Sequence, residues 1–233
     1  MTYSSGSTPI TVATGDFNND TRLDLIITNE YGCSVTAETG QVQVQYPVSV
    51  SFAIADFNND NQMDIAVVNL GTNNIDIFLR NGNHFFTSQK KLLTGSSPIA
   101  VAVDDFNSDN ILDIVVANYD SGNVGVFLGC GSGSFLSQKT FPIGSQSRPK
   151  AVAVEDFNNG TFVDIIVANY GMNNMDILFG YDNGSFIDVK LFSMRYESLP
   201  FFVSVGNFNG DRKLDFAVAN KGSGSSEIFL QAC

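Results

Sequence analysis

The stretch Asp105-Phe-Asn-Ser-Asp-Asn-Ile-Leu-Asp113 decides the fold, because versions of it recur along the chain. Its opening phrase returns as Asp-Phe-Asn-Asn-Asp at 16 and 56, Asp-Phe-Asn-Asn-Gly at 156 and Asn-Phe-Asn-Gly-Asp at 207. Successive copies begin 40, 49, 51 and 51 residues apart. Self-similarity at such a period indicates one supersecondary unit repeated five times.

Each acidic stretch lies between two alternating apolar runs, such as 99–103 before and 112–117 after the third copy. A third run follows a Gly/Asn turn, and a fourth, weaker run precedes the next Pro. Four antiparallel strands in about 50 residues are typical of a propeller blade. We therefore predict an all-β fold, a five-bladed β-propeller of four-stranded antiparallel blades, as a single domain over residues 1–233. The phenylalanine at the second position of each copy is expected in the blade core: Phe17, Phe57, Phe106, Phe157 and Phe208.

The two ends of the chain predict how the ring closes. Residues 2–9 match the segment 93–98 that precedes a later first strand, and the sequence ends on Glu227-Ile-Phe-Leu230, the third run of the fifth copy. The N-terminal strand is thus expected to complete the last blade, which would leave no exposed sheet edge. The alternative is an open fragment of a larger propeller.

Oxygen-bearing side chains at loop positions one, three, five and nine predict a metal site. Calcium takes six to eight oxygen ligands, and a backbone carbonyl at position seven would complete the shell. A set without His or Cys excludes zinc and copper, magnesium is the weaker competitor, and no EF-hand Glu stands at position twelve. The expected ligands, with the position-seven carbonyl fourth in each set, are Asp16, Asn18, Asp20, Arg22 and Asp24; Asp56, Asn58, Asp60, Gln62 and Asp64; and Asp105, Asn107, Asp109, Ile111 and Asp113.

The last two copies have fewer carboxylates. Gly160 replaces the acid at position five of the fourth copy, and Asn207 replaces the first acid of the fifth. We therefore expect three to five Ca²⁺ per chain, with affinities falling from copies one to three, through five, to four. The expected ligands are Asp156, Asn158 and Asp164 in the fourth copy, and Asn207, Asn209, Asp211, Lys213 (carbonyl) and Asp215 in the fifth.

A plain turn is the alternative interpretation, because Asn and Asp side chains favour tight turns by bonding their own backbone. The metal interpretation is preferred because a turn does not require a third carboxylate in the following strand. Packing three carboxylates into one turn is also costly without a cation.

The composition limits the partners. Twelve basic against twenty-four acidic residues give a net charge of −12, which repels nucleic acid and anionic surfaces. No apolar run is long enough to cross a bilayer, so no membrane insertion is expected. Three cysteines do not make a disulfide framework. We also expect the protein to be a monomer.

The repeated motifs resemble a known family. Asp-Phe-Asn-x-Asp-x-x-x-Asp, then Val-Ala-Asn-Tyr, Asn-x-Val-x-Val-Phe-Leu-Gly and Gly-x-Gly-Ser-Phe look like the FG-GAP and VCBS repeats of integrin alpha N-terminal propellers. The resemblance covers essentially the whole chain and implies calcium in the loops named above. It further implies an extracellular or cell-surface module for adhesion or recognition. Integrin propellers have seven blades, a departure from the count here.

Three functions are compatible with the sequence. The first is a recognition module that uses a propeller face to bind protein or carbohydrate; Tyr119 and Tyr170, each after an Asn, would line sugar sites or simply pack between blades. The second is a purely structural, calcium-stabilised repeat domain. The third, an enzyme acting on glycans, is disfavoured because the one histidine, His84, stands in a Gly-Asn-His turn and most carboxylates belong to the loops.

Overall fold

A computed structural model describes residues 8–15, 24–29, 32–37, 40–44, 49–81 and 85–231. Its strands pair in chain order within each sheet, antiparallel throughout. The first sheet holds β1 (Pro9–Gly15), β2 (Asp24–Asn29), β3 (Gly32–Ala37) and β4 (Gly40–Val44); the second holds β5 (Ser49–Ala55), β6 (Asp64–Asn69), β7 (Asn74–Asn81) and β8 (Phe85–Leu93).

The third and fourth sheets repeat this pattern, and the fifth has three strands. The third comprises β9 (Pro98–Asp104), β10 (Asp113–Asn118), β11 (Asn123–Phe127) and β12 (Lys139–Pro142); the fourth β13 (Pro149–Glu155), β14 (Asp164–Asn169), β15 (Asn174–Tyr181) and β16 (Ser185–Ser193); the fifth β17 (Pro200–Gly206), β18 (Asp215–Asn220) and β19 (Ser225–Phe229). Two single-turn 3₁₀ segments, η1 (Leu70–Thr72) and η2 (Asp182–Gly184), lie in turns. No helix among the described residues could span a membrane.

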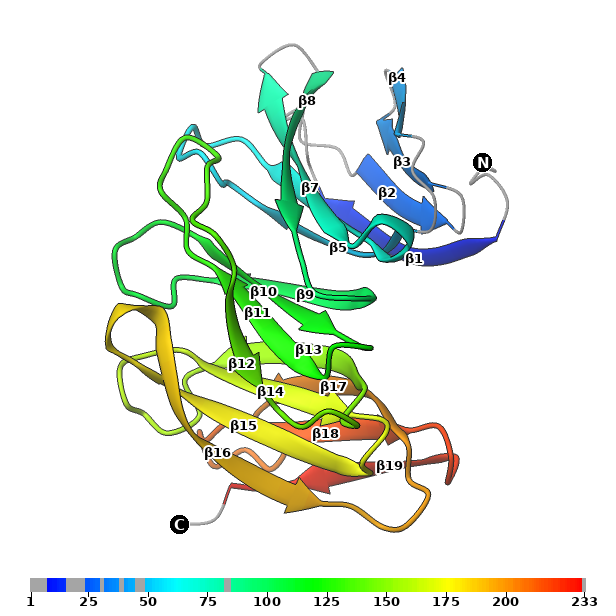
Figure 1. Cartoon of the computed structure of the whole chain (residues 1–233), viewed down its shortest axis with the longest axis vertical. Helices are drawn as coiled ribbons and strands as arrows, with labels where there is room; N and C mark the ends of the chain where they lie inside the picture. The colour runs from blue at the N-terminus through cyan, green and yellow to red at the C-terminus, as the bar shows by residue number, and fades with distance from the viewer. Residues whose placement is uncertain are drawn as a thin grey trace.

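The five sheets follow one another along an open arc (Figure 1). First strands of neighbouring sheets contact each other, β5 with β9, β9 with β13 and β13 with β17, and fourth strands lie on the outside. The first sheet stands at one end of the arc and the fifth at the other (Figure 1). The all-β repeat architecture is therefore as predicted, whereas the described residues show no closed ring. Most of the expected closing strand, residues 2–7, lies outside the described residues, and Pro9 pairs with Asn29 of the first sheet.

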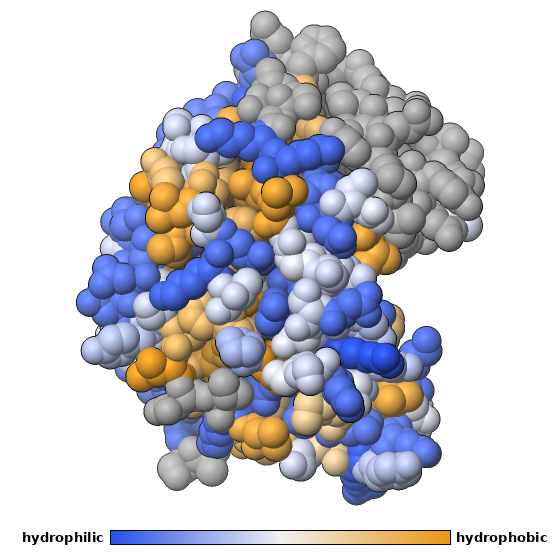
Figure 2. All heavy atoms as spheres, viewed as in Figure 1, coloured by the Kyte–Doolittle hydropathy of each residue, from blue (hydrophilic) through white to orange (hydrophobic). Residues whose placement is uncertain are grey.

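Apolar side chains fill the spaces between neighbouring sheets. One cluster joins the second and third sheets, a second joins the third and fourth, and a third joins the fourth and fifth. The second strands β6, β10 and β14 are buried along their whole length, because each has a sheet on both sides. Apolar side chains also reach the surface in the space-filling view (Figure 2).

The predicted core phenylalanines follow this packing. Phe57, Phe106 and Phe157 are buried and contact the next sheet along the arc, as expected. The prediction for Phe208 is wrong, since that ring is 47% exposed. Within the part of the chain that the structure describes, no sheet follows the fifth one to cover this residue. Phe17 lies outside the described residues.

Buried polar side chains connect the second and third strands near their Asn-rich turn. Both carboxylate oxygens of Asp76 accept hydrogen bonds, from Asn74 (2.8 Å) and Asn69 (2.9 Å). Asp176, the equivalent residue of the fourth sheet, accepts from Asn169 through Oδ2 (2.7 Å), and its buried Oδ1 has no partner. Lys91 faces Asp76 across β7 and β8, whereas Leu191 faces Asp176. Burial raises the pKa of Asp176, and no cation offsets it.

We predict that Leu191→Lys stabilises the protein by about 0.2–1 kcal/mol at pH 7, as expected for an opposite-charge cross-strand pair. Because the folded-state pKa of Asp176 is raised, its ionised form costs stability as pH rises through that pKa. A lysine acts on the ionised form, so the gain should vanish at pH 3. Urea unfolding at both pH values measures it.

Leu93→Lys is the matched control, since Leu93 is also an exposed outer-strand leucine but faces the neutral Asn74. An equal gain from both variants, or a gain that persists at pH 3, would contradict the pairing with Asp176.

Candidate metal centre

The second and third acidic loops adopt the same hydrogen-bonded turn. Asp56 Oδ2 accepts the Asn61 N–H (2.7 Å) and its Oδ1 the Asp60 N–H (3.1 Å). Asp60 Oδ1 then accepts the Gln62 N–H (2.8 Å). In the third loop Asp105 accepts the N–H groups of Asn110 and Asp109, and Asp109 accepts the N–H of Ile111, at the same distances. The backbone therefore brings the side chains of positions one, three and five together in one turn.

Asparagine and serine supply the backbone geometry of these turns. Asn59 and Asn61 have φ of 59° and 63°, and Ser108 and Asn110 have φ of 59° and 64°. Such left-handed residues are common in turns for Asn, because its side chain bonds nearby backbone. Asn58 and Asn107 each accept the N–H of the acid at position five and donate to its carboxylate.

The fourth and fifth loops keep part of this arrangement. Asp156 accepts the N–H groups of Gly160 (2.9 Å) and Thr161 (3.2 Å), but Asn158 turns to donate to Asp164 (3.4 Å). In the fifth loop Asn207 accepts the Gly210 N–H. Asn209 and Asp211 there bond as their counterparts do. In the first loop residues 16–23 lie outside the described residues, so Asp16, Asn18, Asp20 and Arg22 stay predictions; Asp24 begins β2.

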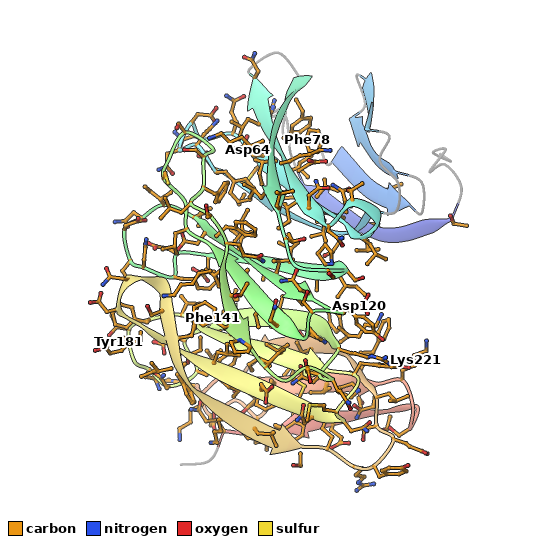
Figure 3. All side chains as sticks on the ribbon, in the orientation of Figure 1. Asp64, Phe78, Asp120, Phe141, Tyr181 and Lys221 are labelled. Carbon is orange, nitrogen blue, oxygen red and sulfur yellow. The ribbon has the colours of Figure 1, made fainter. Side chains whose placement is uncertain are left out.

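The carboxylate at position nine has a role that the sequence did not suggest. Asp64 is fully buried at the start of β6 (Figure 3) and accepts two backbone hydrogen bonds, from Phe57 (2.9 Å) and Arg80 (2.8 Å). The same two bonds recur at 2.7 to 2.9 Å in the other described loops: Asp113 with Phe106 and Gly129, Asp164 with Phe157 and Gly180, and Asp215 with Phe208 and Gln231. Each aspartate thus ties its loop to the end of the third strand.

This role changes the argument for a metal. A third carboxylate in the strand does not by itself require a cation, because it satisfies two backbone donors in every described copy. The partner on the third strand always lies sixteen residues further on. That constant spacing was available in the sequence, but nothing in the side chains of Arg80, Gly129, Gly180 and Gln231 marks their N–H groups as donors.

Electrostatics nevertheless favours a cation beside these loops. Burial raises the pKa of Asp64 to about 6, the two backbone N–H groups oppose this, and the charges of Asp60 and Asp56 raise it further. Asp113 has a pKa of about 6 for the same reasons, with Asp109 and Asp105 as its neighbours. Burial also raises the pKa of Asp164. The acids of one loop therefore lie close enough to repel one another.

The donor set fits calcium. The described loops offer carboxylate and amide oxygens, and each oxygen that accepts one N–H keeps a lone pair for another partner. Within the described ranges no three acidic, His or Cys side chains already converge as a formed metal cluster. The candidate ligands of loops two to five, including the carbonyl donors at Gln62, Ile111 and Lys213, are thus gathered by the turn, while the acids bond backbone N–H groups.

Two FG-GAP-like repeats match the chain, at residues 56–116 and 105–167. Both matches begin at an acidic loop and include the following hairpin. The chain therefore contains two FG-GAP-like repeats within residues 56–167, which supports that part of the resemblance noted from the motifs. No curated protein matches the chain.

Solved structures with a similar fold are propeller-like proteins of low sequence identity. Virginiamycin B lyase from Staphylococcus aureus, solved with quinupristin, is 14% identical with a TM-score of 0.63 over 96% of this chain and 70% of that one. A protein from Lactobacillus plantarum is 12% identical with a TM-score of 0.70, over 96% and 67%. The biofilm matrix protein Bap1 of V. cholerae is 18% identical with a TM-score of 0.56, over 91% and 34%. These likenesses establish a β-propeller-like fold.

We predict that Asp113→Asn destabilises the protein by about 1–3 kcal/mol even in EGTA. An amide offers one acceptor oxygen, so one of the buried N–H groups of Phe106 and Gly129 would lose its partner. Asp109→Asn is the matched control, since Asp109 is exposed and an amide oxygen there can still accept the Ile111 N–H. It should leave stability in EGTA unchanged and weaken calcium binding only. Equal stability of the two variants in EGTA would refute the structural role of position nine.

Proposed function

We propose that this chain is a calcium-stabilised binding module, which uses one face of a β-propeller-like repeat domain to bind a protein or glycan and performs no catalysis. The observation that carries the proposal is the identical turn in loops two and three, which gathers two carboxylates and an amide. Calcium would neutralise these acids and fix the hairpins. We further propose three to five Ca²⁺ per chain, a monomer, and an extracellular or cell-surface location.

Binding is preferred to catalysis because the acids are engaged in structure. Each described position-nine carboxylate accepts backbone hydrogen bonds, and the acids of positions one and five close the turns. His84 lies outside the described residues. The structural neighbours include both a lyase and a biofilm matrix protein. At such identities they support the fold and leave the chemistry open, so the non-enzymatic assignment rests on the residues.

We predict that millimolar calcium raises the melting temperature relative to EGTA and that the dialysed protein retains three or more Ca²⁺. A ligand bound only by the folded state adds about 2.7 kcal/mol per site at a hundredfold excess over its Kd. Thermal unfolding with metal analysis measures both. No bound calcium and no change in melting temperature would refute the proposal that the loops bind calcium.

Gly160→Asp tests the ranking of the loops. The φ of Gly160 is not in the left-handed region, and a Cβ there would meet the Asn158 side chain, a flexible group that can turn away. Restoring the acid should add or tighten one site without altering the fold. Unchanged stoichiometry and affinity would contradict the assignment of position five as a ligand.

We also propose that a fourth strand, supplied by residues 2–9, completes the fifth sheet. β19 has no partner on its outer edge within the described residues. Ile228 and Leu230 are 57% and 55% exposed there, beside a hollow of 710 Å³ lined by Phe192, Phe216 and Phe229 among others. In the second to fourth sheets a fourth strand pairs with this edge.

Deleting residues 1–8 should then release the amides of β19 to rapid hydrogen exchange and enlarge the radius of gyration. Exchange mass spectrometry and small-angle scattering measure these effects. Protection that survives the deletion would exclude closure by this segment. Protection of the full chain that rises with protein concentration would show that a second copy supplies the strand.

A further inference from the structure

Every first strand contains a β-bulge at its second residue. The pairing with the second strand skips Ile10, Val50, Ile99, Lys150 and Phe201 in the five sheets. A bulge leaves the extra residue out of the ladder and redirects its side chain, and bulges are common beside functional sites. The first three copies carry an aliphatic residue at the bulge, whereas the last two carry a cation and an aromatic ring. The fourth and fifth sheets therefore differ at equivalent positions.

These two side chains belong to a row of alternating cations and rings, which we call the cationic row. Lys150 Nζ lies 4.7 Å from the centroid of Tyr119 and 5.5 Å from that of Phe201. Arg148 extends the row beyond Tyr119 (5.9 Å), and Lys221 extends it beyond Phe201 (5.6 Å). Three of the twelve basic residues of the chain thus lie together across the third, fourth and fifth sheets.

Backbone hydrogen bonds hold two members of the row, Tyr119 and Lys221. The N–H of Tyr119 donates to Ser97 O (2.9 Å), and the N–H of Lys221 donates to Leu199 O (3.0 Å). Both residues directly follow the buried asparagine that ends a second strand, Asn118 or Asn220. The row is therefore built on the framework of the repeats and not on a free loop.

The cations of the row are not neutralised within the described residues. No carboxylate there forms an ion pair with Arg148, Lys150 or Lys221. Burial and the charge of Lys221 lower the pKa of Lys150, which shows that like charges approach each other there. In a protein of net charge −12, an unpaired group of three cations is a local site for anions.

The row is accessible from the concave side of the arc. Arg148 and Lys221 are exposed, and Phe201 is 45% exposed. Lys221 and Asp120 both lie on this side (Figure 3). A hollow of 370 Å³ adjoins Arg148, and its one acid, Asp120, accepts a hydrogen bond from Ser97.

The acidic loops are too far away to cancel the row. Lys150 is the second residue of β13 and Asp156 follows the end of that strand, so six extended residue steps separate them by roughly 20 Å. Charges are screened over about 8 Å at physiological ionic strength. The negative loops and the cationic row therefore act as separate surfaces at opposite ends of the first strands.

We propose that the cationic row binds an acidic polysaccharide, whose carboxylate or sulfate groups contact Arg148, Lys150 and Lys221 while its sugar rings pack on Phe201 and Tyr119. This inference rests on the proposed function as a binding module and names the partner class. The exposed ring of Phe201 and the half-buried ring of Tyr119 alternate with the cations and offer apolar contact between the charged groups, which a sugar ring fills and a phosphate backbone does not.

The test measures binding to four polymers by calorimetry in millimolar calcium: polygalacturonate, dextran sulfate, neutral dextran and poly-L-glutamate. The proposal expects one or both acidic polysaccharides to bind, dextran not to bind, and polyglutamate to bind at least roughly tenfold more weakly. The first two polymers separate carboxylate from sulfate recognition. No binding of either acidic polysaccharide, or equal binding of polyglutamate, would overturn the proposal.

Variants taken from the other repeats locate the site. Lys150→Ile copies Ile99, and Lys221→Leu copies Leu70, so each places an aliphatic residue where another repeat already has one. Each should weaken polysaccharide binding by roughly tenfold, the loss of one charge-assisted contact. Phe201→Val, which copies Val50, should weaken binding to the polysaccharide while the charge stays the same.

Lys190→Ile is the matched control, since Lys190 also lies over a phenylalanine, Phe192 at 5.0 Å, but on the outer strand β16. It should leave polysaccharide binding unchanged. An equal loss of affinity in this variant would show that binding depends on the net charge of the protein alone. Calcium-dependent melting without polysaccharide binding would refute the proposed role of the cationic row and leave the proposed function standing. Polysaccharide binding through the row without any effect of calcium on melting would refute the proposed calcium sites and leave the role of the row standing.

Discussion

The pair of backbone hydrogen bonds that each buried aspartate accepts at loop position nine is the constraint on which every described repeat depends. In one contact it fixes the second residue of the acidic loop and the residue that ends the third strand. Without it, the loop between the first two strands and the outer hairpin would be joined only through the strand ladder. A buried N–H without an acceptor is costly, so the carboxylate stays although burial raises its pKa. Calcium at the exposed end of the loop would bind a turn that the buried aspartate already holds in place.

Packing between sheets determines which parts of the chain are stable alone and which need a neighbour. The middle sheets bury their second strands because they have a sheet on each side, and Phe57, Phe106 and Phe157 reach forward into the next sheet. At the C-terminal end this arrangement has no successor, so Phe208, Ile228 and Leu230 are exposed and β19 keeps a free outer edge among the described residues. A repeat array that buries its core between units requires something at its ends. That requirement, more than any single side chain, is the physical ground for a strand at the edge of β19.

The repeat period and alternation were sufficient to predict the strands, their order and the acidic turns. They were insufficient wherever a residue depends on a contact between repeats. Phe208 has a local sequence similar to that of Phe106, but among the described residues no following sheet covers it. Asp64 and Asp113 look like metal ligands in sequence, because their partners are backbone groups that carry no side-chain signal. Lys150 and Phe201 could have been noticed by aligning the repeats, yet only the bulge shows that they are redirected toward one another.

In the fourth repeat the two ends of the first strand carry opposite charge, with Lys150 near its start and Asp156 after its end. This arrangement would have a physical advantage for the proposed binding module. Acidic turns at one end would hold cations that stiffen the hairpins, while the cationic row at the other end stays clear of them by more than a screening length. Stabilisation and recognition then do not compete for the same surface. A ligand at the row would contact the third, fourth and fifth sheets together, so its affinity depends on their relative placement. Because neighbouring sheets meet along their first strands and the Phe at loop position two packs between sheets, order that calcium imposed on the turns would extend to the surface that the row presents.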